Sequence, residues 1–272
     1  LQFKNLRLPK MPADELASAV RWEAADRLNL KSEQYDLQFY DAGEVRQGED
    51  LREEIILMAA SRKAIDQHVN LLTRCNLDPV AIDATPSALS RCLSPSVSNA
   101  DPDAAAQVVL DVGYTNTKVL IARNGRVLFF RTIDMGGQQL DQVVAEHLNL
   151  PKGEAAELRA TLHHVVNGEQ TESSEQPLFG AGNRDNVERA VYEAICTPIS
   201  ELGREVSLCL RYYSVTFRGQ RKKKVTLVGG EASSPEMARI LTEDAGIAVE
   251  STNPLDGIRI DNVEALRGER GH

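Results

Sequence analysis

The stretch DVGYTNTKVLIARNGRVLFFRTIDMGGQQL, Asp111 to Leu140, decides the fold that this sequence predicts. The apolar residues Val108 to Leu110 just before it predict a short strand that delivers Asp111 at its end. Two further strands are predicted at Val119 to Ala122 and at Val127 to Ile133, because Asn124-Gly125 between them is the strongest two-residue signal for a hairpin. The stretch therefore predicts a β-sheet with Asp-x-Gly at the entrance of its hairpin.

The Asp-x-Gly turn is a candidate phosphate site. Gly113 has no side chain, so the backbone can approach a ligand closely there, and its N–H groups can donate to phosphate oxygens. Thr115 and Thr117 add hydroxyl groups beside the turn, and the Asp111 carboxylate can hold a metal-bound water. Taken alone, the turn has an ordinary alternative, in which Asp111 only caps its own turn.

Two pairs of glycines extend this pattern. Gly136-Gly137 precedes an amphipathic helix, which is indicated by the helical spacing of apolar residues from Leu140 to Leu148. Further along, Val225 to Val228 predicts a buried strand, Gly229-Gly230 a tight turn and Pro235 to Ala245 a helix. A strand, paired glycines and a helix N-terminus form a place where backbone can face a nucleotide.

The N-terminal part of the chain predicts a small α/β module and a connector. The expected elements are a helix at Ala13–Leu28, a strand at Tyr35–Tyr40, a polar loop at Asp41–Asp50, a buried strand at Glu54–Ser61 and a helix at Ala64–Cys75. After them we expect a short strand at Val80–Asp83, a helix at Pro86–Leu93 and a linker at Ser94–Ala106, with a second low-complexity loop at Gly168–Glu175.

The composition is that of an ordinary globular protein and excludes several classes. Of 272 residues, 42% are hydrophobic and 26% are charged, which argues against collagen-like and wholly disordered chains. The net charge of -9 would repel a phosphate backbone, so no nucleic acid is expected as a partner. The four cysteines form no CxxC pair, and no apolar run is long enough to cross a bilayer. The chain begins at Leu1 rather than Met, so we expect that something upstream was removed or left out.

Several segments together resemble the PilM family, the cytoplasmic actin-like proteins of type IV pilus assembly, which are related to the cell-division protein FtsA. The resemblance covers nearly the whole chain. It is carried by the Asp111–Leu140 stretch and by LPKMPADELASAVRWEA at Leu8–Ala24, IDATPSALSR at Ile82–Arg91, ISELGREVSLCLRYY at Ile199–Tyr213 and VTLVGGEAS at Val225–Ser233.

The resemblance implies an α/β fold, an actin-like (ribonuclease H-like) domain with an inserted small α/β subdomain. Residues 1–12 would be a remnant strand of subdomain 1A, residues 13–77 would resemble subdomain 1C, residues 78–103 would form the connector, and residues 104–272 would form subdomains 2A and 2B. Most of subdomain 1A, and the first phosphate motif with it, would be missing at both ends of the chain.

The resemblance also implies a nucleotide site, with Asp111 facing the metal. The residues that would bind the cofactor are Asp111, Gly113, Thr115, Thr117, Gly136, Gly137, Arg159, Glu201, Arg204, Gly229 and Gly230. Glu201 and Arg204 lie one helical turn apart, so they could equally be an ordinary surface ion pair. Two places depart from the family: Glu231 stands where a third glycine is usual, and Ala156 and Arg159 stand where relatives carry Glu and Lys.

The implied function is that of a cytoplasmic, nucleotide-binding scaffold of a type IV pilus or related secretion machine, with ATP and Mg²⁺ as cofactors. Its partner would be the N-terminal cytoplasmic segment of a PilN-like protein, which would hold it at the inner-membrane assembly complex; a homo-oligomer is left open. No catalytic residue is assigned, so ATPase activity would be weak or absent. Two alternatives stay open: an active ATPase or phosphotransferase of the same fold, and an adaptor that has lost nucleotide binding.

Overall fold

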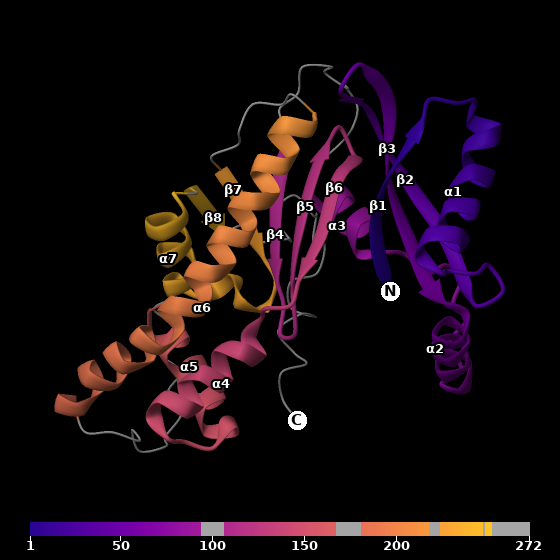
Figure 1. The fold of residues 1–272 in the computed structure, drawn as a ribbon. Coiled ribbons are helices and arrows are strands. Elements are labelled where there is room, and N and C mark those ends of the chain that lie inside the picture. Colours follow the sequence, from indigo (N-terminus) through magenta and orange to yellow (C-terminus); the bar gives the residue numbers. More distant parts are fainter. Residues whose placement is uncertain (94–105, 167–180, 218–223, 247, 252–272) are drawn as a thin grey trace, which may run out of the picture.

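The computed structural model describes residues 1–93, 106–166, 181–217, 224–246 and 248–251. They form a three-stranded sheet and a five-stranded sheet with helices packed on both (Figure 1). The expected loop at Gly168–Glu175 lies outside the described residues, and so does the expected linker except for Ala106.

The smaller sheet is antiparallel, with strand order β1-β3-β2. Its strands are β1 (Gln2–Pro9), β2 (Tyr35–Gln47) and β3 (Asp50–Ser61). Helix α1 (Ala13–Leu28) covers one face through the buried stripe of Leu16, Val20 and Ala24, which the helical spacing predicted. Helix α2 (Arg62–Arg74) follows β3 directly.

Three expectations for this region need correction. The segment Asp41–Asp50 is not a loop, because β2 runs on to Gln47 and a β-bulge beside Gly43, whose φ is 110°, lets the ladder continue. Residues 1–12 were expected to be a remnant strand of another subdomain than residues 13–77. Strand β1 instead pairs with β3 along its whole length, so it belongs to the same sheet. The segment Val80–Asp83 is not a strand: Val80 is 93% exposed, and none of the described strands pairs with the segment.

The larger sheet has the strand order β6-β5-β4-β7-β8. Its strands are β4 (Gln107–Val112), β5 (Thr117–Arg123), β6 (Arg126–Ile133), β7 (Lys224–Val228) and β8 (Ala248–Ser251). The predicted hairpin is confirmed: β5 and β6 pair antiparallel, and Asn124 and Gly125 both have positive φ, at 50° and 74°. By contrast, β7 runs parallel to both β4 and β8, which brings the ends of β4 and β7 to the same edge.

Helices bury the larger sheet. They are α4 (Gly137–Leu148), α5 (Lys152–Val166), α6 (Ala181–Thr216) and α7 (Pro235–Ala245), with a short 3-10 helix, η1 (Gly230–Ser233), between β7 and α7. Helix α6 runs across the sheet between α4 and α7 (Figure 1), and its buried side chains, including Ile195, Ile199 and Leu202, join the main apolar core.

The two sheets are joined by an apolar cluster and a polar link. Helix α3 (Thr85–Leu93) and the β5–β6 hairpin pack against the smaller sheet, and the rings of Phe3 and Phe130 lie 4.4 Å apart. Beside them Glu54, 1% exposed on β3, accepts hydrogen bonds from Arg7 Nε (2.7 Å) and from the hydroxyl of Tyr212 on α6 (2.6 Å). This buried carboxylate fixes β1 and β3 to the last turns of α6.

Candidate functional site

The glycine turns predicted far apart in the sequence meet at one edge of the larger sheet. Asp111 on β4 is paired in register with Val228 on β7, so the two strands end side by side. A Cβ atom added at Gly229, where φ is 100°, would lie 2.6 Å from Asp111 Oδ1 and even closer to the carbonyl oxygen of Val112. Only glycine fits this contact, so the turn after β7 is tied to the turn after β4.

The start of α4 joins the same junction. A Cβ atom at Gly136 would lie 2.5 Å from the carbonyl oxygen of Gly113 and 2.6 Å from that of Tyr114. The backbone N–H of Gly137 donates to Gly113 O (3.0 Å), and that of Gln138 donates to Tyr114 O (2.7 Å). Two of the N–H groups that a helix N-terminus could offer to an anion are therefore already used by the protein.

Asp111 lies at the junction as a paired but accessible carboxylate. Lys118 on β5 approaches Asp111 Oδ2 to 3.0 Å, and the Asp111 side chain keeps 16% of its surface exposed. In the turn that follows, Gly113 N–H donates to Asn116 O at 3.1 Å, and Thr115 is exposed beside it. Gly230 is the first residue of η1, and no atom of the described residues lies within 4 Å of a Cβ atom added there. Close packing among the described residues therefore does not require a glycine at this position.

Thr117 has a structural role in this geometry. Its side chain is fully buried, and its hydroxyl donates to the carbonyl oxygen of Met135 at 2.7 Å. This bond holds the start of β5 against the residue that precedes the Gly136-Gly137 pair. The hydroxyl is not open to a ligand, unlike what the sequence predicted.

Arg159 is buried at the junction rather than free at its surface. It lies on α5 and is 4% exposed, and its guanidinium binds Asp141 on α4 and Glu231 on η1 and donates to Gly137 O at 3.2 Å. Its Nε is a buried donor without a hydrogen-bond partner among the described residues. Arg159 and Glu231, two of the three residues that the resemblance predicted to depart from the family pattern, are therefore bound to each other.

Glu201 and Arg204 are not brought to this junction by any described contact. Both are exposed on α6, and there is no ion pair between them. Their predicted role toward a nucleotide stays a prediction.

Sequence reasoning missed Lys118, Asp141 and Glu54. Asp141 and Glu54 are charged residues inside a predicted helix and a predicted strand, and Lys118 stands directly before the strand predicted at Val119 to Ala122. Charge at such places is usually taken as a sign of a solvent-facing position. Their places in the sequence could have revealed two of them. Asp141 directly follows Leu140 of the apolar stripe on α4, and Glu54 stands in a run that was predicted to be a buried strand. A charge at such a place predicts a buried ion pair, because an unpaired buried charge is costly.

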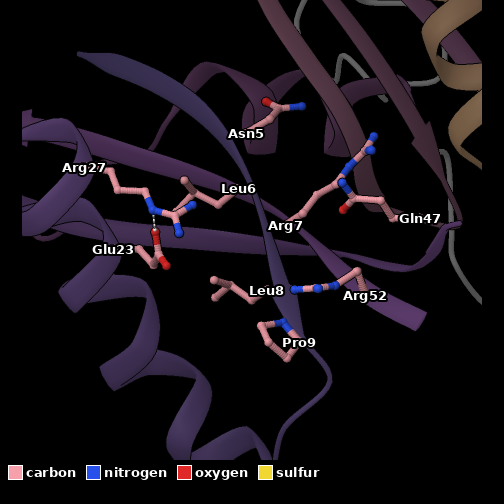
Figure 2. A pocket seen from close by; sticks show the side chains of 9 residues that line it. All are labelled: Asn5, Leu6, Arg7, Leu8, Pro9, Glu23, Arg27, Gln47 and Arg52. Atoms are coloured by element: carbon pink, nitrogen blue, oxygen red, sulfur yellow. Dashed lines mark ion pairs between the residues drawn. The ribbon is translucent and has the colours of Figure 1, made fainter. Parts of the chain in front are cut away.

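Two hollows lie near β1. One of about 450 Å³ lies over the C-terminal half of β1, and Arg7, Arg27 and Arg52 from three different elements line it (Figure 2). In it Arg27 pairs with Glu23 of the same helix. The second, of about 770 Å³, lies between the sheets, with Phe3, Phe129 and Tyr212 in its wall, and it reaches Asn116 in the turn after β4.

The residues at the junction fit a nucleotide. For its phosphate end, Asp111 supplies one accessible carboxylate and Gly230 an open backbone position. For a polar acceptor of its sugar or base, Arg159 keeps a buried donor, Nε, without a hydrogen-bond partner among the described residues. No group of three or more His, Cys, Asp or Glu side chains that could hold a metal occurs among the described residues. A metal would therefore have to be shared between Asp111 and phosphate oxygens, which is how Mg²⁺ is commonly bound.

Comparison with known proteins identifies the family. Residues 4–171, more than half of the chain, match the family model for type IV pilus assembly protein PilM. The chain belongs to the PilM family.

Solved structures agree on the fold of this PilM-family chain. A chain of the PilM–PilN type IV pilus biogenesis complex matches with a TM-score of 0.71 and 24% identity, over 99% of this chain and 70% of that one. Two weaker matches are the ethanolamine utilization protein EutJ from Carboxydothermus hydrogenoformans (TM-score 0.49, 17% identity, 71% and 56% covered) and MreB5 of Spiroplasma citri bound to ADP (TM-score 0.46, 12% identity, 72% and 62% covered). The α/β fold expected of an actin-like PilM-family protein is confirmed by the match at a TM-score of 0.71.

None of the helices in the described part of the PilM-family chain combines the length and the apolar character that a membrane span requires.

Proposed function

We propose that this PilM-family chain is an actin-like scaffold of type IV pilus assembly that binds ATP with Mg²⁺ at the junction of its glycine turns. The observation that carries the proposal is the convergence of Asp111, Gly136 and Gly229, which come from three separate parts of the sequence. A site of this kind presents backbone and one carboxylate to a polyphosphate.

The residues at the junction have distinct roles in this proposal. Asp111 would hold Mg²⁺ through water, Lys118 would keep that carboxylate in place, and the backbone at Gly230 and in the turn at 113–116 would face the phosphates. When bound, Mg²⁺ neutralises phosphate charge and so helps an acidic protein to hold a polyphosphate. Two carboxylates beside the junction, Asp141 and Glu231, are both engaged by Arg159 and are not free to orient an attacking water. This supports a scaffold rather than an enzyme.

The proposed partner is the cytoplasmic N-terminal segment of a PilN-like membrane protein, which would bring the chain to the inner-membrane assembly complex. The support is the match to a chain of a PilM–PilN complex. The hollow in Figure 2 is a candidate place on the small sheet for such a segment, because it lies along β1, an edge strand that pairs on one side only.

Calorimetric titration of ATP with Mg²⁺ tests the proposed nucleotide site. The chain should bind, and Asp111→Asn should weaken binding by about tenfold or more, since a charge-assisted contact contributes about 1.5–3 kcal/mol. The matched control is Asp66→Asn on the exposed face of α2, which makes the same charge change far from the junction and should leave the affinity unchanged.

Two results would contradict this proposal. Turnover of ATP faster than about 1 per second is a normal enzyme rate and would favour the ATPase alternative. Absence of binding would favour the adaptor without nucleotide, an alternative that the Arg159–Glu231 pair supports. Binding of a PilN-like peptide, measured in the same titrations, separates a working adaptor from an inactive protein.

A further inference from the structure

The buried guanidinium of Arg159 connects three elements beside the glycine turns. Arg159 from α5 binds Asp141 from α4 and Glu231 from η1, and its Nη1 also donates to Gly137 O. Arg159 and Asp141 each keep only 5% of their side-chain surface exposed, whereas Glu231 keeps 16%. Glu231 is therefore the member of the cluster that reaches the outside.

The Glu231 carboxylate fills space at the first turn of α4. A Cβ atom at Gly137 would overlap Glu231 Oε1, so the carboxylate lies directly against the backbone of Gly137. The N–H of Gly137 is the group that donates to Gly113 O. Since Gly229 and Gly230 immediately precede Glu231 in the chain, its side chain lies inside the junction of the three glycine turns.

The charges of the cluster do not balance. One guanidinium faces two carboxylates, which leaves an excess negative charge in a poorly solvated place. Glu231, the more exposed of the two carboxylates, can leave the cluster without stranding the buried guanidinium, because Asp141 still pairs with Arg159. Arg159 also keeps one donor, Nε, without a hydrogen-bond partner among the described residues.

We propose that Glu231 is an internal occupant of the nucleotide site, which competes with the ligand for Arg159. This inference rests on the nucleotide binding proposed above. On binding, hydroxyl or ring-nitrogen acceptors of a nucleoside take the Nη2 and Nε donors of Arg159, and Glu231 turns outward to water. Asp141 stays on Arg159 throughout, so the guanidinium remains paired.

The exchange has a mechanical consequence. In the free chain the Arg159–Glu231 pair ties η1, and α7 directly after it, to α4 and α5. When the nucleotide releases Glu231, that tie is lost and the two groups of helices can move relative to each other. A ligand shifts a conformational equilibrium only through such a difference in contacts between the two states.

The test compares Glu231→Ala with Asp141→Asn. Both variants remove one negative charge from Arg159, but only Glu231→Ala empties the space at Gly137. Titration with fluorescent ATP and Mg²⁺ should show Glu231→Ala binding about tenfold tighter than the unchanged chain, as expected if the site is open in roughly one in ten molecules of the unchanged chain. Asp141→Asn should bind no tighter than the unchanged chain.

Urea unfolding supplies a second readout. Without nucleotide, Glu231→Ala should have the same or a lower midpoint than the unchanged chain, because an internal contact is lost. With saturating ATP it should gain more stability than the unchanged chain does. A variant that is merely less stable would not show the second effect, since tighter binding to the folded state is what raises the midpoint.

Each outcome of the titrations either supports or overturns the role inferred for Glu231. Tighter binding by Glu231→Ala alone, including binding that only this variant shows, supports the inference. Equal affinity of Glu231→Ala and the unchanged chain overturns it and leaves the proposed nucleotide site standing. A gain as large in Asp141→Asn also overturns it, because the effect would then be one of charge only. If neither chain binds ATP, both the nucleotide site and this inference fail.

Discussion

Replacing Glu54 by Ala should be among the most destabilising single changes in the smaller sheet. The carboxylate is 1% exposed and accepts from Arg7 Nε at 2.7 Å, from the Tyr212 hydroxyl at 2.6 Å and from Asn5 Nδ2 at 3.3 Å. Its hydrogen bond with Arg7 raises the pKa of that guanidinium. Without Glu54, the guanidinium and the hydroxyl lose their acceptor in a place where little water can replace it.

The size of the effect follows from the burial of each partner. Breaking a buried charge pair by removing one member costs about 3–5 kcal/mol. Arg7 keeps 32% of its side-chain surface exposed, so part of its charge is rehydrated, and we expect the lower end, about 3 kcal/mol. Tyr212→Phe removes the hydrogen bond that the hydroxyl donates to the carboxylate and the one that it accepts from Arg7 Nη2, and should cost about 1.5–3 kcal/mol.

Urea unfolding followed by circular dichroism measures this cost. The matched control is Glu53→Ala on the same strand: burial raises the pKa of Glu53, and its Oε2 has no hydrogen-bond partner among the described residues. The control should change the stability by less than about 0.5 kcal/mol. If Glu54→Ala costs no more than Glu53→Ala, the buried link to α6 does not exist as described.

Three further predictions concern single side chains. Gly229→Ala should destabilise the chain by about 2 kcal/mol in urea unfolding because its φ is 100° and the new Cβ would meet backbone, whereas Gly230→Ala should be nearly neutral; equal effects would contradict the tight junction. Burial raises the pKa of Tyr212 above its ordinary value of 10. The protonated hydroxyl should therefore contribute its full stabilisation below pH 10, and this contribution should be lost as the pH rises through the raised pKa. In urea unfolding at a series of pH values, Tyr212→Phe should lack this part of the alkaline loss of stability. Burial raises the pKa of Cys209 to about 11, so a thiol reagent at pH 8 should label the exposed Cys75 and reach Cys209 only after unfolding, as mass spectrometry of the labelled peptides will show.

The sequence predicted those elements whose conformation is determined by neighbouring residues in the chain. Asn124-Gly125 fixes a two-residue hairpin whatever surrounds it, because both residues take positive φ at little cost. The polar segment Asp41–Asp50 was misjudged, since its two glycines and its charges are typical of a loop. In the structure a β-bulge lies beside Gly43 and the strands pair past it, which only the neighbouring strand decides.

The candidate site divides in the same way. Glycines mark places where backbone packs against backbone, so Gly136 and Gly229 could be found in the sequence and their meeting inferred from the order of elements. Thr117 was misassigned because a hydroxyl beside a turn gives no sign of which way it points. The partners of Arg159 could not be predicted either, since Asp141 and Glu231 come from separate helices that only the folded core brings together.

The resemblance to the PilM family predicted two separate departures from its pattern, at Glu231 and at Arg159. In the structure the two residues bind each other, so they act as one feature. The charge of Glu231 is met by Arg159, and the planar guanidinium also holds Asp141. Helix α6 packs against both α4 and α7, the helices beside this cluster, and its last turns are bound to Glu54 on the smaller sheet. Helix α6 therefore connects the helices beside Glu231 with the smaller sheet.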